Sequence, residues 1–162
     1  MKAGKNKSKA ERAHIYYTGR VQGVGFRYTA EKIAMELALA DAGLPASEIG
    51  YVNAHGTGTQ HGDIAESHAT GKVFGDAVPI SSLKSYMGHT LGACGALEAW
   101  IGIEMMREGW FAPTINLKNV DPSCAELDYI VVQGRQLQTE YVMSNNFAFG
   151  GINTSLIFKR HG

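Results

Sequence analysis

Two histidines and a lysine stand on loops, each shortly after an apolar run. His55 lies in the glycine- and threonine-rich turn of residues 53–59, and Lys84 and His89 follow the next apolar run. Such runs are typical of buried strands, and in open α/β sheets functional groups gather at the carboxyl ends of strands. The sequence therefore predicts that these titratable side chains meet in one site.

A second candidate site lies nearer the amino terminus. Residues 13–18 are expected to form a strand, residues 19–27 a glycine-rich loop that ends in Arg27, and residues 28–43 a helix. A strand, a glycine loop and an arginine at a helix start can together bind an oxyanion through backbone N–H groups. This stretch therefore predicts anion binding.

The remaining elements must position the histidine loops. Strands are expected at residues 49–53, 78–82, 111–116 and 128–132, with a closing antiparallel pair at 141–144 and 154–159; helices are expected at 63–74 and 91–108. The helix over residues 91–108 is crowded with glycine and alanine, which lowers its helix propensity. We therefore expect it to be central and to pack closely against another backbone.

Composition narrows the function class. The chain has 162 residues, 44% of them hydrophobic, and its fifteen basic and fifteen acidic side chains cancel, so nothing indicates a nucleic-acid binder. The two cysteines are too few for a disulfide framework, which favours reduced thiols in a cytoplasmic protein. No uninterrupted apolar stretch reaches transmembrane length, and the amino terminus lacks the apolar region of a signal peptide. Residues 1–11 read as a solvated disordered tail rather than a basic arm for an acidic partner.

Residues 12–38 resemble the start of an acylphosphatase, on the strength of the run from Gly19 to Arg27. The resemblance implies that an acyl phosphate is bound by Arg27 and the amides of residues 21–25, which include Gly23, Val24 and Gly25. That family also uses an asparagine to position the attacking water. Asn53 is the candidate for it, although its run is one residue out of step and the rest of that family's sheet has no counterpart.

Residues from about 39 to 160 resemble the carboxy-terminal half of an elongating β-ketoacyl-acyl carrier protein synthase, and we assign residues 39–162 to this region. The matching stretches are residues 53–59, 82–85, 88–93, 113–117 and 147–153, in the order that this family has them. The resemblance implies a thiolase-like α/β fold in which a mixed sheet is flanked by helices. It also implies that only one of the two halves of that fold is represented, with the two resembling segments joined near residues 35–40, as in a mosaic.

The resemblance assigns roles in decarboxylative Claisen condensation. His55 and His89 would be neutral N–H donors to the oxygen of a malonyl thioester, where negative charge develops. Lys84 would keep the histidines neutral, because a nearby ammonium disfavours the imidazolium form. Glu66 would hold this lysine. No metal ion or resident cofactor is implied.

The same resemblance assigns substrate contacts. Thr57 and Thr59 would bind the phosphopantetheine arm, which arrives on acyl carrier protein. Phe149 would gate the acyl pocket and add its N–H to the oxyanion hole, within a turn that also holds Phe147 and Gly150.

The family's nucleophilic cysteine belongs to the other half, and neither Cys94 nor Cys124 matches its setting. Three hypotheses follow: half of a condensation site that depends on another chain for a cysteine, an acyl-phosphate hydrolase, or a non-catalytic module for carrier protein or a ketosynthase partner. The apolar helix over residues 91–108 favours self-association or a ketosynthase-like partner.

Overall fold

A computed structural model describes residues 24–148 and 150–161 of the chain. Within these residues a five-stranded mixed sheet has the order β4-β2-β1-β6-β7. Its strands are β1 (Ile49–Asn53), β2 (Pro79–Ser81), β4 (Asp128–Tyr129), β6 (Tyr141–Phe147) and β7 (Asn153–Lys159). All neighbours are parallel except β6 and β7, which are antiparallel. The expectation of a mixed α/β sheet is confirmed.

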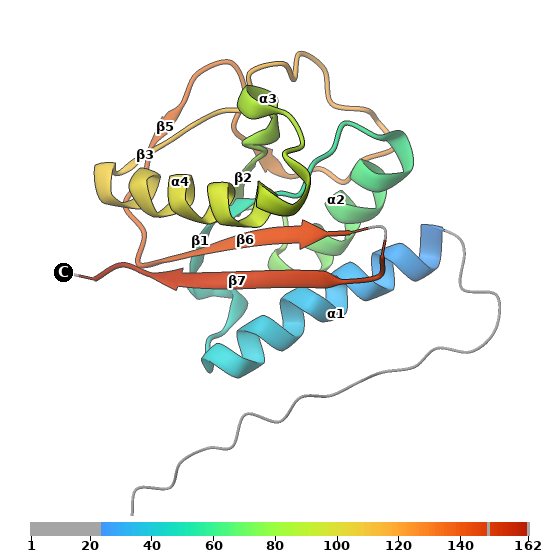
Figure 1. Cartoon of the computed structure of the whole chain (residues 1–162), viewed down its shortest axis with the longest axis horizontal. Helices are drawn as coiled ribbons and strands as arrows, with labels where there is room; N and C mark the ends of the chain where they lie inside the picture. Colours follow the sequence, from blue (N-terminus) through green and yellow to red (C-terminus); the bar gives the residue numbers. More distant parts are fainter. Residues whose placement is uncertain (1–23, 149, 162) are drawn as a thin grey trace, which may run out of the picture.

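Helices cover both faces of this sheet (Figure 1). On one face α1 (Val24–Ala42) packs against α2 (Gln60–Phe74) and β7, and on the other face α4 (Cys94–Glu108) crosses β6. Shorter elements complete the described chain: η1 (Ala46–Glu48), α3 (Lys84–Met87), η2 (Leu91–Ala93), β3 (Trp110–Phe111) and β5 (Arg135–Gln136), the last two forming a separate antiparallel pair. In the described part of the chain no helix is long and apolar enough to cross a membrane.

The central strands alternate between two apolar cores. Val52 and Met143 face α1 and α2, whereas Tyr51 and Val142 face α4, and all four are almost fully buried. Because both faces are covered, β1 reads as a continuous apolar run rather than as an alternation. The same burial fixes the ends of β1 and β6. His55 follows β1 by two residues, and Phe147 is the last residue of β6.

Three expected element boundaries need correction. Residues 24–27 form the first turn of α1 rather than a loop, since α1 packs along α2 from its start; this one helix crosses the expected junction at residue 39. The strand expected at 111–116 ends at Phe111 because Pro113 has no N–H to donate, although Thr114 still bridges Val131. The long helix starts at Cys94 rather than at Leu91, whose φ of 52° lies in the left-handed region. The tail over residues 1–11, the strand over residues 13–18 and most of the glycine-rich loop lie outside the described residues.

Because the central strands are buried on both faces, we expect truncation of a side chain there to lower the free energy of unfolding strongly. Met143→Ala removes a side chain that is 0% exposed, and we expect it to lower the free energy of unfolding by about 2–5 kcal/mol. Leu37→Ala on α1 is the matched control, because Leu37 is 55% exposed and its truncation should change that free energy by less than about 0.5 kcal/mol. Urea unfolding of the three proteins measures both effects. Equal midpoints for the two variants would contradict the assignment of this core.

Candidate active site

His55 and His89 face each other at the carboxyl end of the central strands. His55 follows β1, His89 follows α3, and their ring centroids lie 5.3 Å apart with perpendicular planes. Phe147, the last residue of β6, packs its ring against His55 at a centroid distance of 6.1 Å. The structure thus brings together the two histidines that the sequence indicated, with Phe147 beside them.

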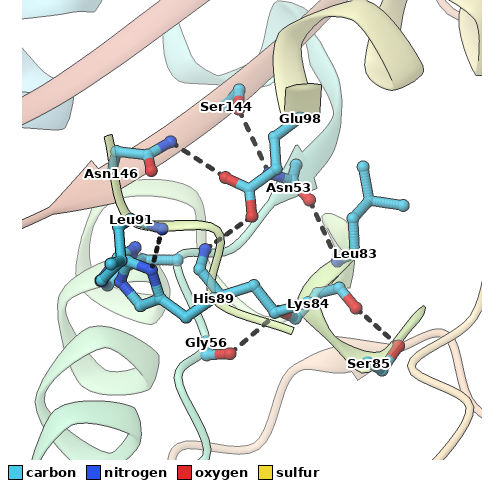
Figure 2. A network of polar contacts seen from close by, with 12 residues as sticks. Asn53, Gly56, Leu83, Lys84, Ser85, His89, Leu91, Glu98, Ser144 and Asn146 are labelled. Carbon is cyan, nitrogen blue, oxygen red and sulfur yellow. Dashed lines mark hydrogen bonds and ion pairs between the residues drawn. The ribbon is translucent and has the colours of Figure 1, made fainter. Parts of the chain in front are cut away.

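His55 is held in its neutral form. Burial lowers the pKa of its imidazole to about 4, and the positive charges of Lys84, His89 and Arg27 add to the effect in that order. At neutral pH this ring can therefore donate an N–H hydrogen bond but carries no charge. The ring of His89 accepts a hydrogen bond at Nδ1 from the amide of Leu91, at 3.1 Å (Figure 2). In the neutral ring this leaves the proton on Nε2, which is then the donor.

Lys84 is held by Glu98, a residue that the sequence analysis missed. Its Nζ lies 2.6 Å from Glu98 Oε1, with only 5% of the lysine side chain and none of the glutamate side chain exposed. Asn146 on β6 donates to the second oxygen of Glu98 at 3.0 Å (Figure 2). A signal was present in the sequence: Glu98 lies four residues from both Cys94 and Gly102, so it shares the buried stripe of an otherwise apolar helix.

Glu66 does not hold the lysine, contrary to the expectation. Its two carboxylate oxygens accept hydrogen bonds from the amides of His55 and Gly56, at 2.7 and 2.8 Å. Burial raises the pKa of Glu66 to about 7, and these amides together with the charge of Lys84 oppose the rise. Glu66 reaches the turn from α2, on the opposite face of the sheet from Glu98. Its observed role is to fix the backbone that carries His55.

The turn after His55 is tightly packed. Gly56 has φ +41°, and a Cβ at this position would lie 2.7 Å from that of Ser82, so a side chain fits neither sterically nor conformationally. Ser82 also donates its hydroxyl to the carbonyl of Gly56 at 3.0 Å. The hydroxyls of Thr57 and Thr59 lie 3.0 Å apart, so the two expected arm-binding groups form one polar edge beside the histidine.

A cavity of about 590 Å³ lies behind this turn, between α2, β2 and the loop over residues 114–121. Thr57, Glu66 and Lys84 line it, whereas neither histidine does. The cavity therefore borders Lys84 and the turn after His55 on a side that neither imidazole ring lines.

The residues of the acylphosphatase interpretation do not converge. Asn53 donates its side-chain amide to Ser144 and accepts from the amide of Leu83, on the α4 face of the sheet. Arg27 lies on the α1 side, where its Nη1 is 3.2 Å from the place that a Cβ on Gly62 would take. Val24 and Gly25 are in the first turn of α1, and Gly23 lies outside the described residues.

The turn between β6 and β7 is described except for one residue. Gly150 is exposed there, and Ala148 and Ile152 close the turn with a backbone hydrogen bond of 3.0 Å. Phe149, the expected gate of the acyl pocket, lies outside the described residues.

The buried ion pair leads to a prediction about stability. Glu98→Gln leaves the ammonium of Lys84 buried without a compensating charge, which should lower the free energy of unfolding by about 3–5 kcal/mol. The control is Glu104→Gln on the same helix, because the pair of Glu104 with Arg107 is exposed and such pairs contribute less than about 1 kcal/mol. Urea unfolding at pH 7 measures both. Similar losses of unfolding free energy in the two variants would show that the buried pair contributes no more to stability than the exposed pair.

Comparison with known proteins agrees with this geometry. Residues 21–118 match the family model of the beta-ketoacyl synthase C-terminal domain. A 3-oxoacyl-acyl-carrier-protein synthase 2 of Coxiella burnetii is 43% identical over 129 residues, which are 78% of this chain and 31% of that protein. The match to the family model begins within the stretch assigned to an acylphosphatase, and the comparisons lend that assignment no support.

Solved structures give the same result. A beta-ketoacyl synthase from Burkholderia phymatum superposes with a TM-score of 0.82 at 65% identity, covering 83% of this chain and 33% of that one. A type II polyketide ketosynthase, solved in complex with its acyl-carrier protein and bound to a hexaketide, superposes with a TM-score of 0.77 at 33% identity, covering 82% of this chain and 34% of that one. The chain thus spans about a third of the length of the relatives it matches. With a thiolase-like partial fold and a matching family model, the chain belongs to the beta-ketoacyl synthases, of which it carries the carboxy-terminal domain.

Proposed function

We propose that this chain supplies the histidine half of a decarboxylative condensation site, as used in fatty-acid or polyketide synthesis. The observation that carries the proposal is the pair of facing imidazoles, His55 and His89, with His55 held neutral by burial and by Lys84. Two neighbouring imidazole N–H donors can stabilise an oxyanion without a proton transfer. The charge of Lys84 is itself balanced by Glu98, so the site does not attract a second anion by charge alone.

The chemical step that these donors serve is the loss of carbon dioxide from a malonyl thioester. The bond between the methylene carbon and the carboxylate carbon breaks, and its electron pair forms an enolate whose negative charge lies largely on the thioester oxygen. His55 and His89 donate to that oxygen and lower the barrier. The enolate carbon then attacks an acyl thioester, and the thiolate of that thioester leaves.

Neither cysteine of this chain is placed to carry the acyl group. Cys94 is buried at the start of α4 with 2% of its surface exposed. Burial raises the pKa of the Cys124 thiol, and its loop is tied to α2 through the amide of Ala125, which donates to Ser67. A thiol whose pKa is raised is a poor nucleophile at neutral pH. The acyl-bearing cysteine therefore comes from the half of the family fold that this chain does not match.

The malonyl group reaches the histidines on the phosphopantetheine arm of acyl carrier protein. The hydroxyl edge of Thr57 and Thr59 supports this, because it lies in the same turn as His55 and can bond to the amides of the arm. We assign Phe147, whose ring packs against that of His55, to the acyl side of the site together with Gly150. The solved complex of a related ketosynthase with its carrier protein supports the same class of partner.

The partner half covers the outer face of α4. On this helix Ala96, Trp100 and Ile103 are exposed at helical spacing, and Trp100 is 61% exposed. The face differs from the glycine-rich face that the sequence suggested, because Gly102 is buried and Gly95 packs beside Asn146. An exposed apolar stripe of this kind is typical of an interaction surface. We assign it to a ketosynthase-like half or to a second copy of this chain.

The donor role predicts a measurable loss of decarboxylation. The chain should release carbon dioxide slowly from a malonyl thioester, because that step needs the donors and no cysteine. His89→Ala should slow it by about 10²–10³-fold, as expected for the loss of one oxyanion donor. The exposed His161, at the far end of the chain, is the matched control, and His161→Ala should leave the rate unchanged. A genuine rate that survives His89→Ala would refute the donor role.

The partner face predicts a change in association. Trp100→Ala removes the largest exposed side chain of α4 and should weaken self-association at least severalfold, since buried tryptophans carry much of the energy of interfaces. Leu37→Ala, on the opposite face of the sheet, should have no effect. Sedimentation velocity at several concentrations measures both. A parent chain that stays monomeric throughout, and binds no ketosynthase half, would overturn the assignment of this face.

A further inference from the structure

The sheet ends on one side in a long strand whose outer edge has no partner among the described residues. In the part of the chain that the structure describes, β7 has β6 as its only strand neighbour. β7 is seven residues long and apolar at its centre, where Leu156 is 48% exposed. Proteins usually cover or shorten such an edge, because its N–H and C=O groups pair readily with another strand. We therefore expect the outer edge of β7 to have an occupant.

The hydrogen bonds between β6 and β7 show which backbone groups face this edge. The amide of Ala148 donates to the carbonyl of Ile152 at 3.0 Å. At the other end of the pair, the amide of Arg160 donates to the carbonyl of Glu140 at 2.8 Å. Along an antiparallel pair, successive residues point their backbone groups alternately at the neighbouring strand and away from it. In β7 the even-numbered residues therefore point at β6, and residues 153, 155, 157 and 159 point outward.

Helix α1 packs against β7 and begins at the end of the sheet where the histidines lie. Its first turn holds Arg27, whose Nη1 is 3.2 Å from the place that a Cβ on Gly62 would take, in the first turn of α2. α2 in turn starts beyond the carboxyl end of β1, and Figure 1 shows the start of α1 at the end to which β6 points. A strand directly before α1 would therefore end at this side, parallel to β1 and antiparallel to β7.

The handedness of crossovers decides where in the sheet such a strand would lie. β1, α2 and β2 form a parallel crossover, and α2 packs on the same face of the sheet as α1. Nearly all such crossovers are right-handed, so two crossovers on one face step along the sheet in the same direction. The step from β1 to β2 leads towards β4. A strand before α1 must therefore lie on the opposite side of β1, beyond β6 and β7, which is the outer edge of β7.

The segment over residues 13–18 has the composition and the place in the chain for this edge. Residues 15–18 are isoleucine, two tyrosines and threonine, which are residues that favour strands. Residues 19–23 connect the segment to α1, and connections of about 2–6 residues are usual between a strand and the helix that follows it. We propose that residues 13–18 form an edge strand that pairs antiparallel with β7. This pairing depends neither on the condensation chemistry nor on the acylphosphatase resemblance.

The register follows from the two faces of β7. Ile157 packs against the core under α1, whereas Phe158 packs against the core under α4, so Leu156 also points to the α4 side. Six residues fit along the seven of β7 in two ways, which place Ile15 opposite either Leu156 or Ile157. The second way puts Ile15 against the core under α1 and Tyr16 over the exposed Leu156. A shift by one residue would reverse both faces, so the second register is the one proposed.

Amide hydrogen exchange of the full chain tests the pairing. In the parent, the outward amides of residues 155, 157 and 159 should exchange as slowly as the inward amides of residues 154, 156 and 158, because the added strand supplies their acceptors. Ile15→Pro removes the N–H that would bond to Ile157 and disfavours a paired strand. It should speed exchange of the outward amides by about tenfold or more and leave the inward amides unchanged.

The control for this experiment is Lys7→Pro, which lies outside the segment and should reproduce the parent. Fast exchange of the outward amides in the parent would overturn the proposal, as would slow exchange that Ile15→Pro leaves intact. Slow exchange that appears only at high protein concentration would show that a second copy of the chain occupies the edge, and this result would overturn the proposal as well.

A pair of cysteines tests the register without a proline. Opposed residues at the non-hydrogen-bonded sites of an antiparallel pair have Cα atoms about 4.5 Å apart, within the range of a disulfide. Tyr16→Cys with Leu156→Cys should therefore form a disulfide inside one chain on mild oxidation, identified by peptide mapping. Tyr17→Cys with Leu156→Cys is the control and should not, because these side chains point to opposite faces. No disulfide in the first pair, an equal yield in both pairs, or a bond only between two chains would each overturn the proposal.

Discussion

The site depends on the ion pair between Lys84 and Glu98, in which both side chains are buried. An ammonium at the edge of a sheet core is tolerated only where a carboxylate compensates it and the remaining oxygens are hydrogen-bonded. Here Asn146 satisfies the second oxygen of Glu98, so the network joins α3, α4 and β6. Of these elements, α3 and α4 flank the loop with His89. The loop is thereby tied to the α4 face of the sheet.

The opposite face provides a separate carboxylate. Glu66 reaches from α2 to the backbone of the His55 turn, where it accepts hydrogen bonds from the amides of His55 and Gly56. The two histidines are therefore held from different layers, one through Glu66 and the other through the Lys84–Glu98 pair. They meet because β1 and β2 are parallel neighbours in the sheet, so the segments that carry His55 and His89 leave the sheet at the same edge. The two histidines can be held from different layers only because helices cover both faces of the mixed sheet.

The sequence predicted the parts of this arrangement that are local in the chain. The apolar runs before His55 and Lys84, and the glycines in their turns, are signals within a few residues. Both strands were found as expected, whereas Lys84 begins the short helix α3 rather than standing in a loop. The partner of Lys84 was misassigned because the choice between Glu66 and Glu98 depends on which helix crosses which face. Likewise, glycines at residues 19–25 favoured a loop up to Arg27, whereas packing along α2 extends the helix to Val24. Pairings between layers have no short-range signature.

The neutral state of His55 links the site to the exposed face of α4. Burial is the largest cause of its lowered pKa, ahead of the neighbouring charges, and the ring is only partly buried in the described residues. If a partner half covers α4, as the exposed Trp100 favours, it removes further water from the end of the sheet where both rings lie. Lower local polarity disfavours the imidazolium form still more and strengthens each N–H bond to a developing oxyanion. Association would then improve the donors themselves as well as supply the nucleophile, and decarboxylation should be faster in the assembled protein than in the isolated chain even when the cysteine takes no part in the step.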